Sequence, residues 1–348
     1  MRVNLGFNSG FRGRAKILVL APDPCGTEVM TDRYGRKRSA RYVVDRPWQN
    51  NLILNTGLNQ LATYLIADCF KYAAAGYGTS VADPTQTTLD TERGGSGDVN
   101  APYRTNTYLT GAGNCGTTHV AGSDTYVYKR TYDFSEQITP GTYGEVGLAP
   151  TATRNDPLFS RIQLAGTVGV AAGQQLRLVY ELTHTIAPVT PAALTPTITG
   201  WASTDGDHVL AQLSHNLVNT NGARTTDGNL TGLLGEPSDV TLTCALSETA
   251  DALANYEDAV VVRTSIGRAA FVSEAYVAGS HERVMNAVFT PGTANSSAIR
   301  AICVGYSDGI WSLPEADGKA WEFLFDSNQE KLNTHRLTIT LTKSWNRV

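Results

Sequence analysis

A thiol and an imidazole lie four residues apart in the sequence, at Cys115 and His119. A cysteine becomes a nucleophile when a basic partner holds it as a thiolate on a strained, exposed turn. One glycine and two threonines separate the two residues, which is typical of a Gly-rich loop tip. We favour that interpretation over a catalytic pair, and the sequence contains none of the common zinc-protease or phosphate-loop motifs.

Two groups of acidic residues have the composition of cation or glycosidase sites. The first group consists of Asp205, Asp207, His208 and His215. A calcium loop begins with such alternating carboxylates but also needs a bidentate glutamate at a fixed position downstream. No glutamate occupies that position here, so we favour a solvated turn. The second group is the pair Glu248 and Asp251, and a glycosidase pair requires a fixed separation across a cleft that sequence spacing does not supply.

Five cysteines are scattered along the chain without a CxxC spacing. They are Cys25, Cys69, Cys115, Cys244 and Cys303. Because their number is odd and no metal-ligand spacing occurs, we predict reduced thiols that are mostly buried as small apolar side chains. We therefore expect no catalytic residue, no metal site, no cofactor and no enzymatic activity.

Aromatic residues are the other candidates for ligand contact. The chain contains fifteen Tyr and five Trp, the latter at Trp48, Trp201, Trp311, Trp321 and Trp345. Flat aromatic faces beside Asn, Asp and Gln can stack on sugar rings, but cores and subunit interfaces use the same residues. We favour core and interface roles and keep carbohydrate contact as an alternative.

Charge is distributed unevenly along the chain. Residues 1–46 contain ten Lys and Arg against four Asp and Glu, a charge of +6, whereas the net charge of the whole chain is −4. Five residues of the segment 33–41 are basic. Three interpretations of the segment are open: a solvated hairpin, an arm that docks on an acidic patch of a neighbouring subunit, or a nucleic-acid contact. We favour docking over nucleic acid, because the rest of the chain, at −10, would repel a duplex.

Strand patterns dominate the elements that must position these residues. Short apolar or alternating runs between Pro, Gly, Asn and Asp predict strands within 15–20, 27–31, 41–44, 126–134, 144–148, 158–164 and 175–183. In the last of these, Leu176, Leu178, Tyr180 and Leu182 alternate with polar residues, which predicts a strand buried on one face.

One segment has a helical pattern instead. Leu54, Leu58, Leu61 and Leu65 recur at intervals of three and four within residues 51–70. This spacing predicts a single helix whose apolar side belongs to the core. Asn55 is the expected N-cap, because its side chain can accept a hydrogen bond from the first turn.

An internal repeat suggests two related units. In the first half, Phe134 and Pro140-Gly-Thr precede an apolar strand ending at Gly147, and the alternating strand 176–183 closes the unit. In the second half, Phe289 and Pro291-Gly-Thr precede an apolar strand ending at Gly305, and the strand 335–342 closes the unit.

We therefore predict a mainly β fold of tandem antiparallel β-sandwich-like domains, with one short packed helix and a basic N-terminal β-hairpin arm. The predicted parts are the arm at 1–47, a helix-plus-sandwich domain at 48–186, a Pro-rich linker at 187–196 and a second sandwich at 197–348.

The N-terminal residues have no apolar h-region, and no window has the length of a membrane span. We expect a protein that is made and kept in the cytoplasm, without a membrane partner.

Several of these segments carry a family resemblance. They are residues 51–61 (Asn-Leu-Ile-Leu-Asn-Thr-Gly-Leu-Asn-Gln-Leu), 76–79, 84–92, 144–148, 158–161, 173–180 and 338–347. They resemble a group of tail and appendage proteins of tailed bacteriophages, and the resemblance covers most of residues 48–184 and the end of the chain but not 197–280. Its motifs are fold signatures without chemistry. The resemblance implies a place in the virion, in a tail fibre, tail tip, baseplate or collar, after assembly in the host cytoplasm.

The expected function is that of a structural virion component. We expect the chain to associate with copies of itself, as a trimer or hexamer, and with other virion proteins, because symmetric assembly closes exposed sheet edges. The alternative is a host-receptor or carbohydrate-binding adhesin module that contacts a host surface glycan. A capsid decoration protein and a glycan depolymerase are further hypotheses.

Overall fold

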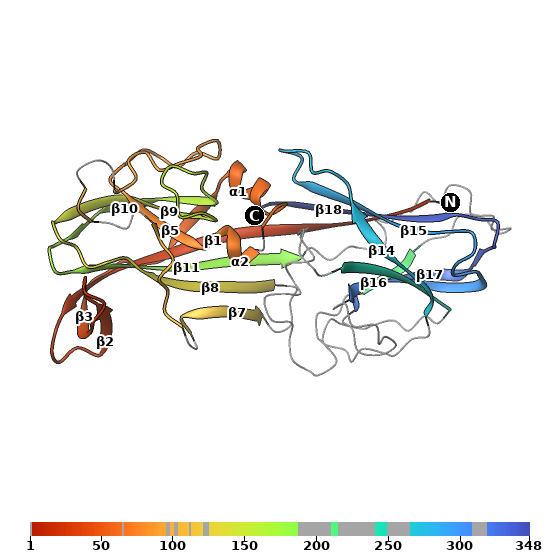
Figure 1. Ribbon diagram of the computed structural model, residues 1–348, viewed down its shortest axis with the longest axis horizontal. Helices are drawn as coiled ribbons and strands as arrows, with labels where there is room; N and C mark the ends of the chain where they lie inside the picture. The colour runs from red at the N-terminus through yellow and green to blue at the C-terminus, as the bar shows by residue number, and fades with distance from the viewer. Residues whose placement is uncertain are drawn as a thin grey trace. The chain divides into compact units, whose positions relative to one another are not determined.

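The chain is mainly β, as predicted, with two short helices in the residues that the structure describes (Figure 1). This computed structural model describes residues 2–64, 66–94, 98–100, 104–110, 113–120, 125–186, 210–214, 241–248, 265–307 and 319–348. None of the helices in these ranges is long and apolar enough to cross a membrane.

The chain forms two compact units. The N-terminal unit consists of Gly10–Thr185 and Asn346–Val348, and the C-terminal unit consists of Ile186–Trp345 and Met1–Ser9. The predicted arm of residues 1–47 is therefore divided between them: residues 10–47 belong to the same unit as the first predicted sandwich. The predicted linker, 187–196, lies outside the described residues.

The N-terminal unit contains two sheets joined by one strand. Its elements are β1 (Arg2–Pro22), β2 (Glu28–Thr31), β3 (Lys37–Asp45), β4 (Gln49–Ile53), α1 (Asn55–Gln60), α2 (Ile66–Cys69), β5 (Tyr72–Gly76), β6 (Arg104–Thr105), β7 (Cys115–Val120), β8 (Thr125–Asp133), β9 (Gly141–Ala149), β10 (Ser160–Val170) and β11 (Gln175–Ile186). One sheet contains β7, β8, β11 and β1 in hydrogen-bonded order, and the other contains β4, β10, β9, β5 and β6. Strand β4 belongs to both, because its first residues pair with β1 and its last residues pair with β10.

The C-terminal unit has the same plan. Its strands are β12 (Leu210–Ser214), β13 (Thr241–Ser247), β14 (Ser265–Ser273), β15 (Glu282–Phe289), β16 (Ser296–Ser307), β17 (Lys319–Lys331) and β18 (Leu337–Arg347). One sheet has the order β12, β17, β16, β13, β14, and β15 pairs with β18. Strand β14 links the two, because it pairs first with β13 and then with β15.

The repeat in the sequence falls on strands with equivalent partners. In the N-terminal unit β9 lies between β5 and β10, and in the C-terminal unit β16 lies between β13 and β17. The closing strands β11 and β18 pair with β8 and β15, the strands that precede the two Pro-Gly-Thr segments. The two units therefore share one strand order.

The predicted single helix is wrong. The structure has two short helices, α1 and α2, and Leu54 rather than Asn55 occupies the N-cap position, without a side-chain hydrogen bond. The apolar spacing correctly marked buried residues, since Leu54, Leu58 and Leu61 are all in the core; Leu65 lies outside the described residues. Glycine and two asparagines within Asn55–Gln60 are weak helix formers, so the helix ends after six residues.

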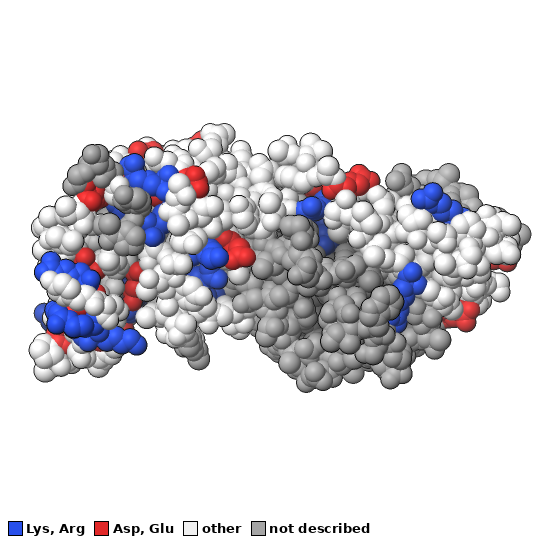
Figure 2. Space-filling view, viewed as in Figure 1, with Lys and Arg blue, Asp and Glu red and all other residues white. Residues whose placement is uncertain are grey.

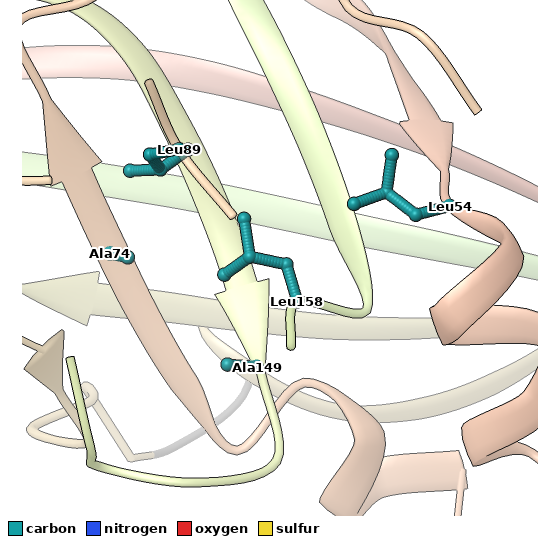
Figure 3. Packing of buried hydrophobic residues seen from close by; sticks show 5 residues of the cluster. All are labelled: Leu54, Ala74, Leu89, Ala149 and Leu158. Atoms are coloured by element: carbon teal, nitrogen blue, oxygen red, sulfur yellow. The ribbon is translucent and has the colours of Figure 1, made fainter. Parts of the chain in front are cut away.

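The core of the N-terminal unit extends from the strands to the residues beside α1. Figure 3 shows one cluster in which side chains from separate segments converge: Leu54, Ala74, Leu89, Ala149 and Leu158. Leu89 belongs to a long connection between β5 and β6, so this connection contributes to the core.

Strand β11 is buried on both faces, contrary to the prediction of one buried face. Leu176, Leu178, Tyr180 and Leu182 are buried as expected, and so are the polar residues Gln175, Arg177 and Glu181. Polar side chains tolerate burial when they are hydrogen-bonded. Glu181 accepts a hydrogen bond from Nε of Arg14 at 2.7 Å, and Arg177 pairs with Asp133, so partners on β1 and β8 cover this face.

Candidate functional site

The basic segment 33–41 lies at the end of a long β-hairpin. Residues 18–22 of β1 and all of β2 pair antiparallel with the same strand, β3, from Leu18↔Asp45 to Thr31↔Lys37. A bulge of residues 23–27 separates β1 from β2, because Pro22 and Glu28 both pair with Ala40. We call residues 18–45 the basic hairpin.

Asp32 organises the turn of the basic hairpin. Its Oδ1 accepts the backbone N–H groups of Tyr34 and Arg36, both at 2.9 Å, and its Oδ2 accepts Nε of Arg36 at 2.8 Å. Gly35 has φ +80°, a conformation that glycine adopts without strain. Burial would raise the pKa of Asp32, but the hydrogen bonds from Arg36 and Tyr34 outweigh it and hold this pKa below its ordinary value. The turn therefore has a fixed shape with a carboxylate inside it.

The outer surface of the basic hairpin combines cations with exposed aromatic and apolar groups. Tyr34 is 66% exposed, and the Cζ atoms of Arg33 and Arg36 lie 4.8 Å and 5.1 Å from its ring centroid. Val29, Tyr42 and Val43 are also exposed. Figure 2 shows Lys and Arg gathered where Figure 1 places β2 and β3. Arginine and tyrosine are among the residues most enriched at the energetic centres of protein interfaces.

The base of the hairpin is held by a residue at the start of β11. Arg177 pairs with Asp133 on β8, with Nε 2.6 Å from Oδ1, and donates to the carbonyl oxygen of Val29 at 2.8 Å. Its other amino group lies 3.3 Å from both Glu28 and the Tyr42 hydroxyl. Hydrogen bonds to both strands of the hairpin from one buried guanidinium keep the hairpin from moving as a free arm.

A second hydrogen bond reaches the turn itself. The backbone N–H of Arg33 donates to Oε2 of Glu136 at 2.8 Å, and Glu136 lies in the connection between β8 and β9. The turn and the base are therefore both attached to the N-terminal unit. A surface that is ordered before it binds loses less conformational entropy on association.

The five basic residues of the segment 33–41 differ in their partners. Arg36 and Arg38 pair with Asp32, and Arg41 pairs with Asp23 at 3.3 Å. Among the described residues, Arg33 and Lys37 have no ion pair. The basic hairpin contains no pair of groups placed for proton transfer. Its exposed cations can bind an acidic group.

The structure overturns the loop-tip interpretation of Cys115 and His119. Both residues lie in strand β7, and Cys115 is opposite Arg130 while His119 is opposite Tyr126. Four residues of extended strand place their backbones about 13 Å apart. A direct thiol–imidazole pair requires a much shorter backbone separation than this.

The acidic groups are only partly described. Asp205, Asp207, His208, His215 and Asp251 lie outside the described residues. Glu248 is exposed and accepts a hydrogen bond from the Ser296 hydroxyl. No group of three or more metal-ligating side chains occurs within the described parts of the chain.

The cysteines and tryptophans occupy varied positions. Cys69 and Cys244 are buried, Cys25 is exposed and Cys115 is partly buried, and none of these four forms a disulfide; the side chain of Cys303 is not described. Trp345 is in the core and stacks on Tyr276. Trp48 is partly exposed, with the Arg14 guanidinium 4.6 Å from its ring centroid. Trp201 and Trp311 lie outside the described residues, as does the side chain of Trp321.

Sequence reasoning missed the buried ion pairs of the N-terminal unit. Arg161 pairs with Glu145, and Arg104 pairs with Glu92 at 2.7 Å, with all four side chains fully buried. The available signal was a charged residue inside an apolar strand, as in Gly144-Glu-Val-Gly147. Its partners come from other strands and loops, so the sequence pattern alone could not pair them.

The fold and the hairpin together define a two-unit β-sandwich-like protein with a rigid, basic, aromatic-bearing hairpin. No protein-family model, curated protein or solved structure matches the chain.

Proposed function

We propose that the chain is a structural component of a tailed-phage particle, in the tail, baseplate or collar, that associates with copies of itself and docks on neighbouring virion proteins. The basic hairpin carries this proposal. It presents Tyr34 and several cations on a turn whose shape is fixed by Asp32 and whose base is held by Arg177. Preorganised Arg and Tyr side chains favour a protein partner.

The resemblance to phage tail and appendage proteins supports a virion location. The two-unit β architecture is compatible with it, and both units share one strand order. Structural proteins of this kind bind through extended surfaces and need no reactive pocket.

The carbohydrate-binding alternative has weaker support. A sugar ring stacks on an open aromatic face, whereas the rings of Tyr34 and Trp48 already have guanidinium groups near them. Guanidinium groups beside an aromatic ring favour a carboxylate-bearing partner over a neutral glycan.

Two measurements test the proposal. Mass spectrometry of tailed particles purified from a culture that produces this chain should detect it in a fixed ratio to the other particle proteins. Sedimentation of the purified full chain should show a defined homo-oligomer. Absence of the chain from the particles would overturn the proposed virion location. A monomer at all accessible concentrations would overturn the proposed self-association.

A further inference from the structure

The two units share a strand order but differ in charge. Residues 10–185 contain 17 Lys and Arg and 15 Asp and Glu, whereas residues 186–345 contain 9 Lys and Arg and 17 Asp and Glu. The first segment therefore has a charge of +2 and the second a charge of −8. Such asymmetry between halves of similar architecture points to partners of opposite charge.

Within the N-terminal unit, five acidic residues outside the hairpin form ion pairs with residues of the same unit. Four pairs illustrate this: Glu145 with Arg161, Glu92 with Arg104, Asp133 with Arg177, and Glu181 with Arg14. On the hairpin, Arg33 and Lys37 form no ion pair with the described residues. The segment 33–41 contains five basic residues and no acidic residue, whereas the rest of residues 10–185 contains 12 Lys and Arg and 15 Asp and Glu, so positive charge is concentrated around the turn of the hairpin.

The C-terminal unit offers carboxylates on its surface. In its described parts, Glu248, Glu274, Glu282 and Glu330 are all exposed. No ion pair is formed by any of these four among the described residues. Exposed carboxylates of this kind can attract a cationic surface over a distance of about 8 Å at physiological salt.

We propose that the basic hairpin of one copy docks on the acidic C-terminal unit of a second copy, so that chains associate head to tail. This inference rests on the proposed function, in which the chain assembles with itself, and it names the surfaces that meet. Such a contact is heterologous, since two different surfaces of the same chain meet, and repeating it closes a ring or extends a filament.

A protein partner fits the hairpin better than nucleic acid does. Arg36, Arg38 and Arg41 already hold carboxylates of the hairpin, which leaves two of the five cations for a new partner. The exposed Val29, Tyr42 and Val43 give the surface an apolar component that a phosphate backbone would not use.

Charge exchange between two full-length variants tests the inference. The hairpin variant is Arg33→Glu with Lys37→Glu, which breaks no ion pair of the described residues. The acidic-unit variant is Glu248→Lys, Glu274→Lys and Glu330→Lys. Each variant alone should bind itself at least about tenfold more weakly than the parent chain, because like charges then meet. An equimolar mixture should recover the association, since each surface regains an opposite partner.

A matched control separates local from global charge effects. The substitutions Arg12→Glu and Lys71→Glu change the net charge by the same amount at exposed positions outside the hairpin. This control should associate like the parent chain. Sedimentation at 0.15 M and 1 M NaCl, with circular dichroism to verify folding, gives the readouts.

The outcomes distinguish the inference from the proposed function. A parent chain that is monomeric overturns both. If the hairpin variant associates as tightly as the parent chain, the head-to-tail contact is overturned and self-assembly stands. The same holds if the parent chain associates as tightly at 1 M NaCl as at 0.15 M NaCl. Failure of the mixture to recover association shows that the hairpin binds another surface. Loss of association after nuclease treatment identifies nucleic acid as the partner and also overturns the inference.

Discussion

Arg161 and Glu145 pair on the neighbouring strands β10 and β9, with Nε of Arg161 2.9 Å from Oε2 of Glu145 and both side chains fully buried. Glu145 also accepts the backbone N–H groups of Gly78, Asp90 and Thr91, at 3.1, 3.1 and 2.9 Å. One buried carboxylate therefore joins the sheet to the start and to the middle of the connection that supplies Leu89 to the core.

Replacing Glu145 with Gln should destabilise the N-terminal unit strongly. The amide keeps the size of the side chain but removes the charge that compensates Arg161, and breaking a buried pair costs about 3–5 kcal/mol. Urea unfolding followed by tryptophan fluorescence measures the change. Asp45→Asn is the matched control, because Asp45 pairs with Lys16 at an exposed position, where the loss is about 1 kcal/mol or less. Equal losses for the two variants would contradict the role assigned to Glu145.

The sequence predicted the fold class because alternation and turn residues are local signals. The strand 175–183 and the buried Leu54, Leu58 and Leu61 were identified from spacing alone. The polar face of β11 was assigned to solvent, because its burial depends on Arg14 and Asp133, which lie far away in the sequence.

The same distinction applies to the candidate site. The charge of the segment 33–41 was visible in the sequence, and so was a possible hairpin. Its anchoring by Arg177 and Glu136 was not, since these contacts join residues more than 100 positions apart. The alternation of apolar and polar residues along a strand carries no information about partners so distant in the sequence.

Replacing Arg177 with Met should release the base of the hairpin. Asp133 would then be buried without its partner, at a cost of about 3–5 kcal/mol, and the Val29 carbonyl would lose its side-chain donor. We expect faster amide exchange across β2 and β3 and faster tryptic cleavage after Arg33 and Lys37. Lys129→Met is the control, because Lys129 lies on β8 but forms a longer, partly exposed pair with Glu181. Unchanged exchange in β2 and β3 would show that Arg177 does not hold the hairpin.

Replacing Gly57 with Ala should disturb the start of α1. A Cβ at this position would lie 1.9 Å from the carbonyl oxygen of Phe159, which also accepts the N–H of Leu54 at 3.0 Å. The backbones must separate, at a cost of about 1–3 kcal/mol or more. Gly169→Ala is the control, since a Cβ there has open space. Thermal unfolding of the two variants gives the comparison, and a Gly57 variant as stable as the control would be inconsistent with this close approach.

His184 should make the N-terminal unit sensitive to mild acid. It is fully buried, stacks on Phe11 with ring centroids 4.5 Å apart, and neither ring nitrogen has a hydrogen-bond partner among the described residues. Burial lowers the pKa of His184 from 6.5 to about 3.

The folded state therefore keeps His184 neutral while the unfolded chain binds a proton below pH 6.5. Its contribution to stability is complete above pH 6.5 and decreases as the pH falls toward 3, by about 1.4 kcal/mol per pH unit. Replacing His184 with Phe retains the stack on Phe11 and should remove this slope between pH 6.5 and 5, a range above the ordinary pKa of carboxylates. His335→Gln, which removes a less buried histidine, should leave the slope in place. Urea unfolding at half-unit pH steps measures it, and parallel curves for the parent chain and the His184 variant would exclude this histidine as the source of acid sensitivity.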